Sequence, residues 1–307
     1  MNNTKNQFVT SKILEEKGIS LCIKREDKIH PFISGNKFRK LKFNLLEAKK
    51  QGYKTLLSFG GAYSNHISAL SYAGKVHGFK TIGVIRGDEL ASDIENTLES
   101  NPTLRFAHNN GMQLKFVSRE DYRLKDQPDF VAKRKKEFGK FYELPEGGTN
   151  DLAIKGCQEI LTSNDEKFDF ICVSVGTGGT ISGIIKASSD QQKVFGFPSL
   201  KGDFLRNVIS EKTAGKTNWD LIDTYHFNGY AKVSKNLISF INEFHQQTTI
   251  PLDPIYTGKM MFGIMDLVQK DYFKRDTSIL AIHTGGLQGI EGMNQMLLKK
   301  KLPLINV

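Results

Sequence analysis

Val173-Ser174-Val175-Gly176-Thr177-Gly178-Gly179-Thr180-Ile181-Ser182-Gly183 joins an apolar, strand-like run to a helical pattern through a loop of glycine and threonine. Loop amides and the helix N-terminus after such a loop form a binding site for phosphate. The loop is not a P-loop, and Ile181 stands where a dinucleotide fingerprint requires its last glycine. The stretch therefore predicts phosphate binding outside a standard nucleotide pocket. A glycine-rich turn with a threonine cap is the simpler alternative.

The same alternation of strand-like and helical patterns extends along most of the 307 residues. The expected strands are 21–24, 55–59, 81–85, 114–117, 141–144, 168–175, 194–197 and 279–283. The expected helices include 37–51, 64–77, 151–162, 237–244 and 259–270. This alternation predicts an α/β fold of parallel sheets with helices on both faces.

Glycines follow four of the expected strands, as Gly60-Gly61, Gly147-Gly148, Gly176 with Gly178-Gly179, and Gly285-Gly286. In open α/β sheets, ligands bind at the carboxyl ends of the strands. Each glycine turn alone is explained as well by a tight strand-to-helix connection. Four together predict a shared cleft.

The stretch Ser34-Gly35-Asn36-Lys37-Phe38-Arg39-Lys40-Leu41 places Lys37 at the start of an expected helix. A lysine amine forms Schiff bases with carbonyl groups, and pyridoxal 5'-phosphate carries both an aldehyde and a phosphate. Together with the expected phosphate loop, Lys37 indicates this cofactor.

Three further stretches hold candidate site residues. Ser64 and Asn65 follow Gly60-Gly61, where they would cap a helix whose N-terminus could bind a carboxylate. His66 is either a base or a buried structural histidine. Tyr256 lies in a turn between Pro254 and Gly258, and Thr284 ends the last expected strand. Packing alone would also explain the tyrosine and the threonine.

Composition narrows the class of protein. The chain is 39% hydrophobic and 25% charged with a net charge of +10, and its basic clusters 133–136 and 299–301 are expected to be solvated surface. No apolar run approaches the roughly 20 residues that span a membrane, and residues 1–7 lack a signal-peptide core. Three widely spaced cysteines predict reduced thiols and a cytoplasmic location, and no metal-ligand spacing is present. A basic, non-enzymatic binder of nucleic acid or phosphoanions is the remote alternative.

Six motifs in order carry a resemblance to a known family. They are Lys24-Arg25-Glu26-Asp27, Gly35-Asn36-Lys37-x-Arg39-Lys40-Leu41, Gly60-Gly61-x-x-Ser64-Asn65-His66, the 176–180 loop, Asp253-Pro254-x-Tyr256-x-Gly258-Lys259 and His283-Thr284-Gly285-Gly286. This set resembles the 1-aminocyclopropane-1-carboxylate deaminase / D-cysteine desulfhydrase family of fold-type II pyridoxal-phosphate enzymes. The resemblance covers about residues 21–290.

The resemblance implies how the cofactor is bound. Lys37 would form the Schiff base with its aldehyde, Asn65 would bond its phenolic oxygen, and Thr284 would face its pyridine nitrogen. The phosphate would bind to the loop residues Gly176, Thr177, Gly178, Gly179 and Thr180.

The resemblance also implies the catalytic and substrate-binding residues. Lys37 would remove the α-proton, Ser64 would lie near the substrate carboxylate, and Tyr256 would lie close to the reacting carbon. Asn65 and His66 would complete the substrate site.

Branch-specific residues favour α,β-elimination of D-cysteine over cyclopropane ring opening. His66 and Thr257 resemble the residues of the desulfhydrase branch. At these two positions the deaminases carry glutamine and glutamate. Deaminases also have a second active-site tyrosine, expected near the last Gly-Gly, where this chain has Ala281 and Ile282. Tyr63 departs from both branches and is expected to reshape the substrate pocket. Ring opening, racemisation and dehydration of another amino acid stay open as alternatives.

The resemblance implies a tryptophan synthase β-like arrangement of two open, twisted parallel-sheet domains with the cofactor in the cleft between them. We expect a large domain of residues 1–41 plus 151–307 and a small domain of residues 42–150. A small amino acid is the expected substrate, with no nucleic-acid partner and no membrane association. A homodimer is implied by resemblance.

Overall fold

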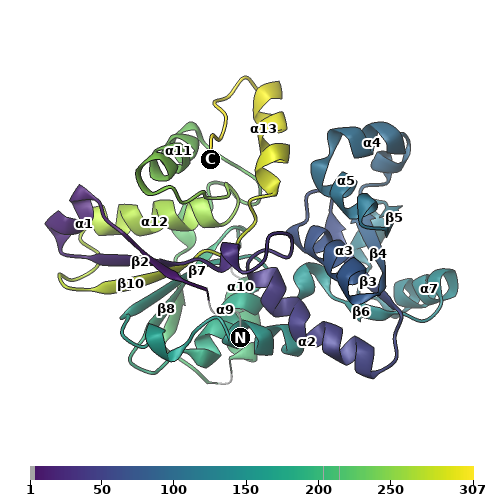
Figure 1. Cartoon of the computed structure of the whole chain (residues 1–307), viewed down its shortest axis with the longest axis horizontal. Coiled ribbons are helices and arrows are strands. Elements are labelled where there is room, and N and C mark those ends of the chain that lie inside the picture. The colour runs from purple at the N-terminus through teal and green to yellow at the C-terminus, as the bar shows by residue number, and fades with distance from the viewer. Residues whose placement is uncertain (1–3, 203, 214) are drawn as a thin grey trace.

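Two separate sheets form the framework of the chain (Figure 1). A computed structural model describes residues 4–202, 204–213 and 215–307. In the described part, a six-stranded sheet has the order β1-β2-β10-β7-β8-β9 and a four-stranded sheet has the order β5-β4-β3-β6. All these pairings are parallel except that of β1 with β2. The α/β prediction with two sheets of parallel strands is therefore confirmed, with one antiparallel edge strand that the sequence patterns did not reveal.

The strands are β1 (Asn6–Val9), β2 (Ser20–Lys24), β3 (Thr55–Gly61), β4 (Lys80–Arg86), β5 (Met112–Val117), β6 (Tyr142–Leu144), β7 (Phe170–Val175), β8 (Lys193–Pro198), β9 (Trp219–Leu221) and β10 (Ser278–Ile282). The α-helices are α1 (Lys12–Lys17), α2 (Asn36–Lys50), α3 (Asn65–His77), α4 (Ile94–Ser100), α5 (Pro102–Asn109), α6 (Arg119–Arg123), α7 (Pro128–Phe138), α8 (Asp151–Gln158), α9 (Gly179–Ala187), α10 (Phe204–Lys212), α11 (Lys235–Thr248), α12 (Thr257–Gln269) and α13 (Gly289–Lys299). Each strand expected from the sequence overlaps one of these strands.

The six-stranded sheet is covered by helices on both faces, as its continuous apolar strands require. On β10, Ile279 and Ala281 join a core formed with α1, α11, α12 and α13. The intervening Leu280 and Ile282 join a second core formed with α8, α9 and α10. Figure 1 shows α11 and α12 on one side of this sheet and α9 on the other.

The four-stranded sheet repeats the arrangement on a smaller scale. Leu56 of β3 packs with α2, α3 and α5, whereas the adjacent Leu57 packs with α6 and α7 on the other face. Successive side chains of a strand point to opposite faces, which explains why neighbouring residues enter different cores.

Helix α2 connects the two sheets. Its Leu41 and Leu45 belong to the core of the small sheet. Near its start it meets α8 so closely that a Cβ on Gly156 would lie 2.0 Å from the Arg39 carbonyl oxygen. The expected domain boundary between residues 41 and 42 falls inside this helix, and the division into 1–41 plus 151–307 and 42–150 stays a prediction.

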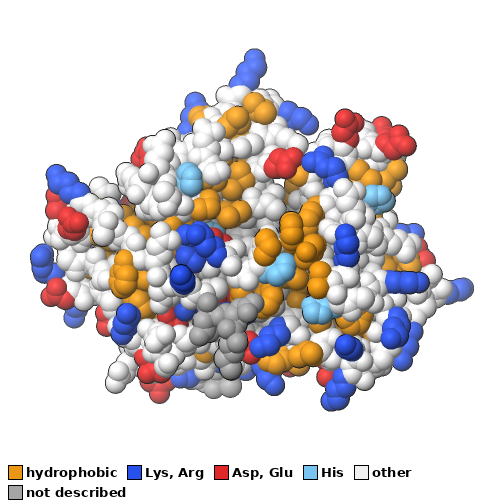
Figure 2. All heavy atoms as spheres, viewed as in Figure 1, with side chains coloured by type: hydrophobic (Ala, Val, Ile, Leu, Met, Phe, Trp, Pro, Cys, Tyr) orange, Lys and Arg blue, Asp and Glu red, His pale blue; other side chains and the backbone are white. Residues whose placement is uncertain are grey.

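Figure 2 shows Lys and Arg gathered at the lower right of one face and mixed with Asp and Glu over the rest of it. Across the described residues, every helix is too short or too polar to cross a bilayer. Residues 1–3, which begin the stretch considered as a signal peptide, lie outside the described residues.

Candidate active site

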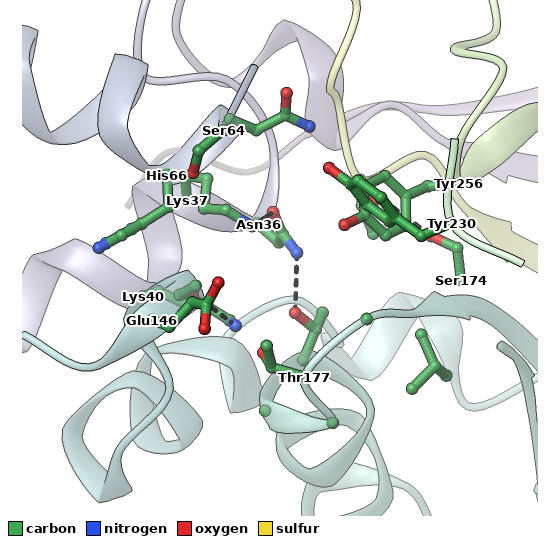
Figure 3. A pocket seen from close by; sticks show the side chains of 18 of the residues that line it. Asn36, Lys37, Lys40, Ser64, His66, Glu146, Ser174, Thr177, Tyr230 and Tyr256 are labelled. Carbon is green, nitrogen blue, oxygen red and sulfur yellow. Dashed lines mark hydrogen bonds between the residues drawn. The ribbon is translucent and has the colours of Figure 1, made fainter. Parts of the chain in front are cut away.

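A pocket of about 470 Å³ lies where strands of both sheets end. Its lining includes glycines from all four of the glycine turns noted above: Gly61, Gly147, Gly176 with Gly178 and Gly179, and Gly285. The carboxyl ends of parallel strands meet at one edge of each sheet, so the two edges face each other across this pocket. In Figure 3, Lys37 and Asn36 lie between Ser64 and Thr177, and Tyr230 and Tyr256 lie together on the opposite side.

The 176–180 loop follows β7, leads into α9 at Gly179 and lines one side of the pocket. Gly178 has a left-handed φ of +83°, which favours glycine. A Cβ on Gly179 would lie 2.7 Å from Thr149 Cγ2, and one on Gly176 would lie 3.2 Å from the ring of Tyr256. These glycines therefore let the loop pack closely against Thr149 and Tyr256.

Lys37 lies in the first turn of α2 and faces this loop. Its Nζ donates to Asn36 Oδ1 at 3.1 Å, and Asn36 Nδ2 donates to Thr180 Oγ1 at 2.8 Å (Figure 3). Burial, together with the positive charge of Lys40, lowers the pKa of Lys37 to about 7. A large fraction of Lys37 is therefore the neutral amine near pH 7, the form that attacks an aldehyde or accepts a proton.

Lys40, one helical turn after Lys37, is a second amine of the pocket, and its side chain is buried. Its Nζ donates to the carbonyl of Gly147 at 3.1 Å and to Thr149 Oγ1 at 2.8 Å. Thr149 Oγ1 lies 2.6 Å from Thr177 Oγ1, which joins Lys40 to the loop. Burial lowers the pKa of Lys40.

The two amines make the pocket suitable for an anion. Within the described residues, no carboxylate lies within ion-pair distance of Lys37 or Lys40. A buried ammonium without a carboxylate is costly unless another anion or several hydrogen bonds accompany it. A phosphate on the 176–180 loop would supply that charge, and an aldehyde near Lys37 would take up its amine. The residues present thus fit pyridoxal phosphate.

The start of α3 brings Ser64 and Asn65 to the pocket. Ser64 Oγ accepts from the Ile67 amide at 3.3 Å, so it caps the helix, as the simpler interpretation of this serine expected. Asn65 Oδ1 accepts from Gln288 Nε2. Both residues line the pocket, beside amides of the helix N-terminus that favour a negative group.

His66 also lines the pocket, but one of its ring nitrogens hydrogen-bonds to Ser58 of β3 in the small sheet. Its Nε2 lies 2.9 Å from Ser58 Oγ, and Ser58 Oγ donates to the Leu144 carbonyl at 2.8 Å. Because the Ser58 proton is used, His66 Nε2 must be the donor and Nδ1 an acceptor. Burial lowers the pKa of His66 well below its usual value, so the ring is neutral. His66 Nδ1 has no partner within the described residues.

Tyr256 is held by the turn that precedes α12. The buried carboxylate of Asp253 accepts from the amides of Ile255 and Tyr256 at 2.9 Å and from the Thr257 amide at 2.8 Å. Burial and the neighbouring Tyr230 raise the pKa of Tyr256 well above its usual value. Its hydroxyl therefore keeps its proton at neutral pH and can donate it.

Tyr230 is a third tyrosine of the pocket, beside Tyr63 and Tyr256, and the sequence patterns did not reveal it. Its ring lies 6.2 Å from that of Tyr256, at an interplanar angle of 65°. The second tyrosine of deaminases was expected near Ala281 and Ile282, but these residues are fully buried in β10. Tyr230 comes instead from a turn-rich segment without a motif, so no sequence signal marked it.

Other pocket residues were missed for different reasons. Asn36 and Lys40 lie in the stretch quoted for Lys37, and the i, i+3 spacing of Lys37 and Lys40 would have placed both on one side of α2. Arg86 ends β4, and Glu146 lies in the 146–148 turn after β6.

Thr284, which the sequence did predict, lines the pocket, and its Oγ1 lies 3.2 Å from Ser174 Oγ.

Comparisons with known proteins agree with this site. The family of pyridoxal-phosphate dependent enzymes matches residues 2–285. The chain belongs to this family. A bifunctional D-cysteine desulfhydrase/1-aminocyclopropane-1-carboxylate deaminase of Arabidopsis thaliana, named as mitochondrial, is 31% identical over 89% of this chain and 74% of that protein.

Two other relatives support the same assignment. A D-cysteine desulfhydrase of Klebsiella pneumoniae is 27% identical over 88% of this chain and 87% of that protein. A crystal structure described as an ACC deaminase homologue has a TM-score of 0.82 and 28% identity, over 97% of this chain and 93% of that one. The predictions of an enzyme of this family, with a fold-type II architecture and pyridoxal phosphate as cofactor, are confirmed.

Proposed function

We propose that this enzyme is a lyase that converts D-cysteine and water into pyruvate, ammonia and sulfide. The observation that carries the proposal is that the Lys37 amine, the 176–180 loop and Tyr256 line one pocket. Relatives named as D-cysteine desulfhydrases and as a bifunctional desulfhydrase/deaminase supply the substrate class.

Five groups would hold the cofactor. We assign its aldehyde to Lys37, its phosphate to Gly176, Thr177, Gly178, Gly179 and Thr180 with Lys40 beside them, its phenolic oxygen to Asn65 and its ring nitrogen to Thr284. When bound, pyridoxal phosphate withdraws electrons from the α-carbon of an attached amino acid. Thr284 and Ser174 offer neutral hydroxyls, which leave the ring nitrogen without a carboxylate partner.

The remaining side chains act on the substrate. Ser64 and the amides at the start of α3 bind its carboxylate, with Asn65 and His66 beside it. Lys37, with its pKa lowered to about 7, takes the α-proton. Tyr256, whose raised pKa keeps the phenol neutral, donates a hydrogen bond to the sulfur as it leaves as hydrosulfide. These roles require the Lys37 amine and the Tyr256 phenol to reach the same substrate molecule, and both side chains line the pocket.

Thr257 favours elimination over ring opening. It occupies the position where the resemblance gives deaminases a glutamate. Its Oγ1 donates to Asp253 Oδ1 at 2.7 Å and accepts from the Asp253 amide at 2.9 Å. The side chain is thus used in the turn and brings no carboxylate to the substrate.

A second candidate is the deamination of 1-aminocyclopropane-1-carboxylate to 2-oxobutanoate and ammonia. Tyr230 favours it, because it places another tyrosine directly beside Tyr256, which the sequence patterns had not predicted. Racemisation or dehydration of another small amino acid would use the same Lys37 and the same cofactor site.

One assay separates these candidates. Protein loaded with pyridoxal phosphate is given D-cysteine, L-cysteine or 1-aminocyclopropane-1-carboxylate, and sulfide, pyruvate and 2-oxobutanoate are measured. We expect sulfide and pyruvate in equal amounts from D-cysteine, little from L-cysteine, and at least tenfold less 2-oxobutanoate, one factor of ten being about 1.4 kcal/mol of discrimination. Release of 2-oxobutanoate as the main product would favour the deaminase. No keto acid from any of the three would refute both.

We further propose a cytoplasmic homodimer. The three cysteines are buried free thiols, which suits a reducing compartment. The dimer rests on the resemblance alone, and sedimentation velocity of the cofactor-loaded protein tests it.

A further inference from the structure

The segment 226–232 carries Tyr230 to the pocket as two consecutive turns. The Gly229 amide donates to the His226 carbonyl at 3.0 Å, and the Lys232 amide donates to the Gly229 carbonyl at 3.2 Å. Three residues other than glycine in this segment are in left-handed conformations, namely Phe227, Asn228 and Ala231. Such conformations persist where surrounding contacts impose them.

Lys259 supplies contacts of that kind. It lies on α12, is 1% exposed, and its Nζ donates to the His226 carbonyl at 2.9 Å and to the Gly229 carbonyl at 2.8 Å. These are the two carbonyls that also close the turns. No carboxylate of the described residues forms an ion pair with Lys259, and Lys259 does not line the pocket. One charged side chain thus joins both turns to α12.

The same side of α12 holds the segment at two further points. The ring of Phe262 packs edge-on against Phe227 with centroids 5.1 Å apart, and Asp266 accepts from the Tyr225 hydroxyl at 2.6 Å. Residues 259, 262 and 266 follow i, i+3 and i+7 spacing, so they form one stripe along the helix. Of the three, Lys259 bonds to the first carbonyl of each turn, and the second of these, Gly229, directly precedes Tyr230.

We propose that Lys259 is a positioning residue that keeps Tyr230 against Tyr256 in the pocket wall and acts on the reaction only through Tyr230. This inference rests on the proposed lyase function. Without Lys259, the two carbonyls keep their backbone partners, so the fold survives while the segment gains freedom. Tyr230 then samples positions away from Tyr256, and the pocket lining that contacts the substrate loses one of its side chains for part of the time.

The first test measures the segment itself. Hydrogen exchange followed by mass spectrometry compares wild type with Lys259→Met, both without substrate. We expect peptides over 226–232 to exchange at least about tenfold faster, as the loss of charged hydrogen bonds predicts, while peptides from β7 and β10 stay unchanged. The matched control is Lys235→Met, which removes an exposed charge from neighbouring α11. Unchanged exchange over 226–232 would overturn the inference.

The second test asks whether Lys259 acts through Tyr230. We expect Lys259→Met to lower kcat/KM about 10- to 100-fold in the wild-type background, because small displacements of a positioned group have effects of this size. In a Tyr230→Ala background, which removes both the ring and the hydroxyl, the same change should cost less than about twofold. An equal loss in both backgrounds would mean a general structural role and overturn the inference. A wild type inactive on all amino acids tested would refute the proposed function, and the exchange result would still decide whether Lys259 holds the segment.

Discussion

The two sides of the pocket are built differently. The phosphate floor, defined as the 176–180 loop with Lys37 and Lys40, is made of backbone turns and short polar contacts close to the first turn of a helix. The outer wall, defined as Tyr63, Arg86, Glu146, Tyr230 and Tyr256, is made of long side chains from separate segments. Tyr63 and Tyr230 are 42% and 41% exposed, whereas Lys40 is 2% exposed. In the proposed roles, cofactor binding rests on backbone turns and buried lysines, and substrate choice rests on the larger side chains of the outer wall.

Removal of the Tyr256 hydroxyl tests this separation of roles and should give the largest effect on kcat. Tyr256→Phe should lower kcat by about 10²–10³-fold, as loss of a hydrogen-bond donor to developing negative charge does, while the affinity for pyridoxal phosphate stays the same. Steady-state kinetics and a cofactor titration measure both. Tyr272→Phe, on an exposed tyrosine, is the control. A fall in cofactor affinity as large as the fall in kcat would show that wall and floor are not separate.

The opposite pattern is expected for the floor. Lys40→Met removes a buried cation and its hydrogen bonds, worth about 1.5–3 kcal/mol, so the Kd for pyridoxal phosphate should rise roughly 10- to 100-fold. At saturating cofactor, kcat for the elimination should change much less. Lys50→Met, an exposed lysine at the end of the same helix, should leave both unchanged. Wild-type affinity in Lys40→Met would contradict the role of this amine.

The pH dependence of cofactor uptake tests the electrostatics of the floor. Because burial and Lys40 lower the pKa of Lys37 to about 7, the neutral amine predominates above that pH and the protonated form below it. The initial rate of pyridoxal-phosphate uptake by cofactor-free protein should therefore rise about tenfold from pH 6 to pH 8, following the neutral fraction. In Lys40→Met the midpoint should move upward, since a like charge is gone. A wild-type rise that begins only above pH 9 would show that Lys37 has an ordinary pKa.

Ser64 should give the smallest effect, because it has a structural and a functional role. Ser64→Ala should lower the free energy of unfolding by about 0.5–2 kcal/mol through loss of the α3 cap. It should also raise KM for D-cysteine a few-fold. Ser234 caps α11 in the same way and lies outside the pocket lining, so Ser234→Ala should reproduce the stability loss alone. Equal KM changes in the two variants would remove Ser64 from the substrate site.

The same contrast explains what the sequence could predict. Glycines, caps and apolar alternation are local signals, and they located the strands, the 176–180 loop and the start of α2. β1 and β9 escaped because each is short and holds only two apolar residues, whereas the equally short β6 has the apolar Phe141 directly before it.

Residues of the outer wall were harder to predict because tertiary contacts bring them together. Tyr230 lies beside Tyr256 on a turn segment whose carbonyls accept from Lys259 of α12, and Arg86 meets the pocket because β4 pairs with β3. His66 was a motif residue whose bond to Ser58 only the folded sheet reveals.

The central claim is that Lys37 is the amine that binds the cofactor aldehyde above the 176–180 loop. Borohydride reduction of the cofactor-loaded protein, followed by peptide mapping in a mass spectrometer, tests it most directly. We predict a single pyridoxyl group on Lys37 and none on Lys40. A pyridoxyl group on another lysine, or no labelled lysine in protein that shows the cofactor's absorbance, would contradict the account.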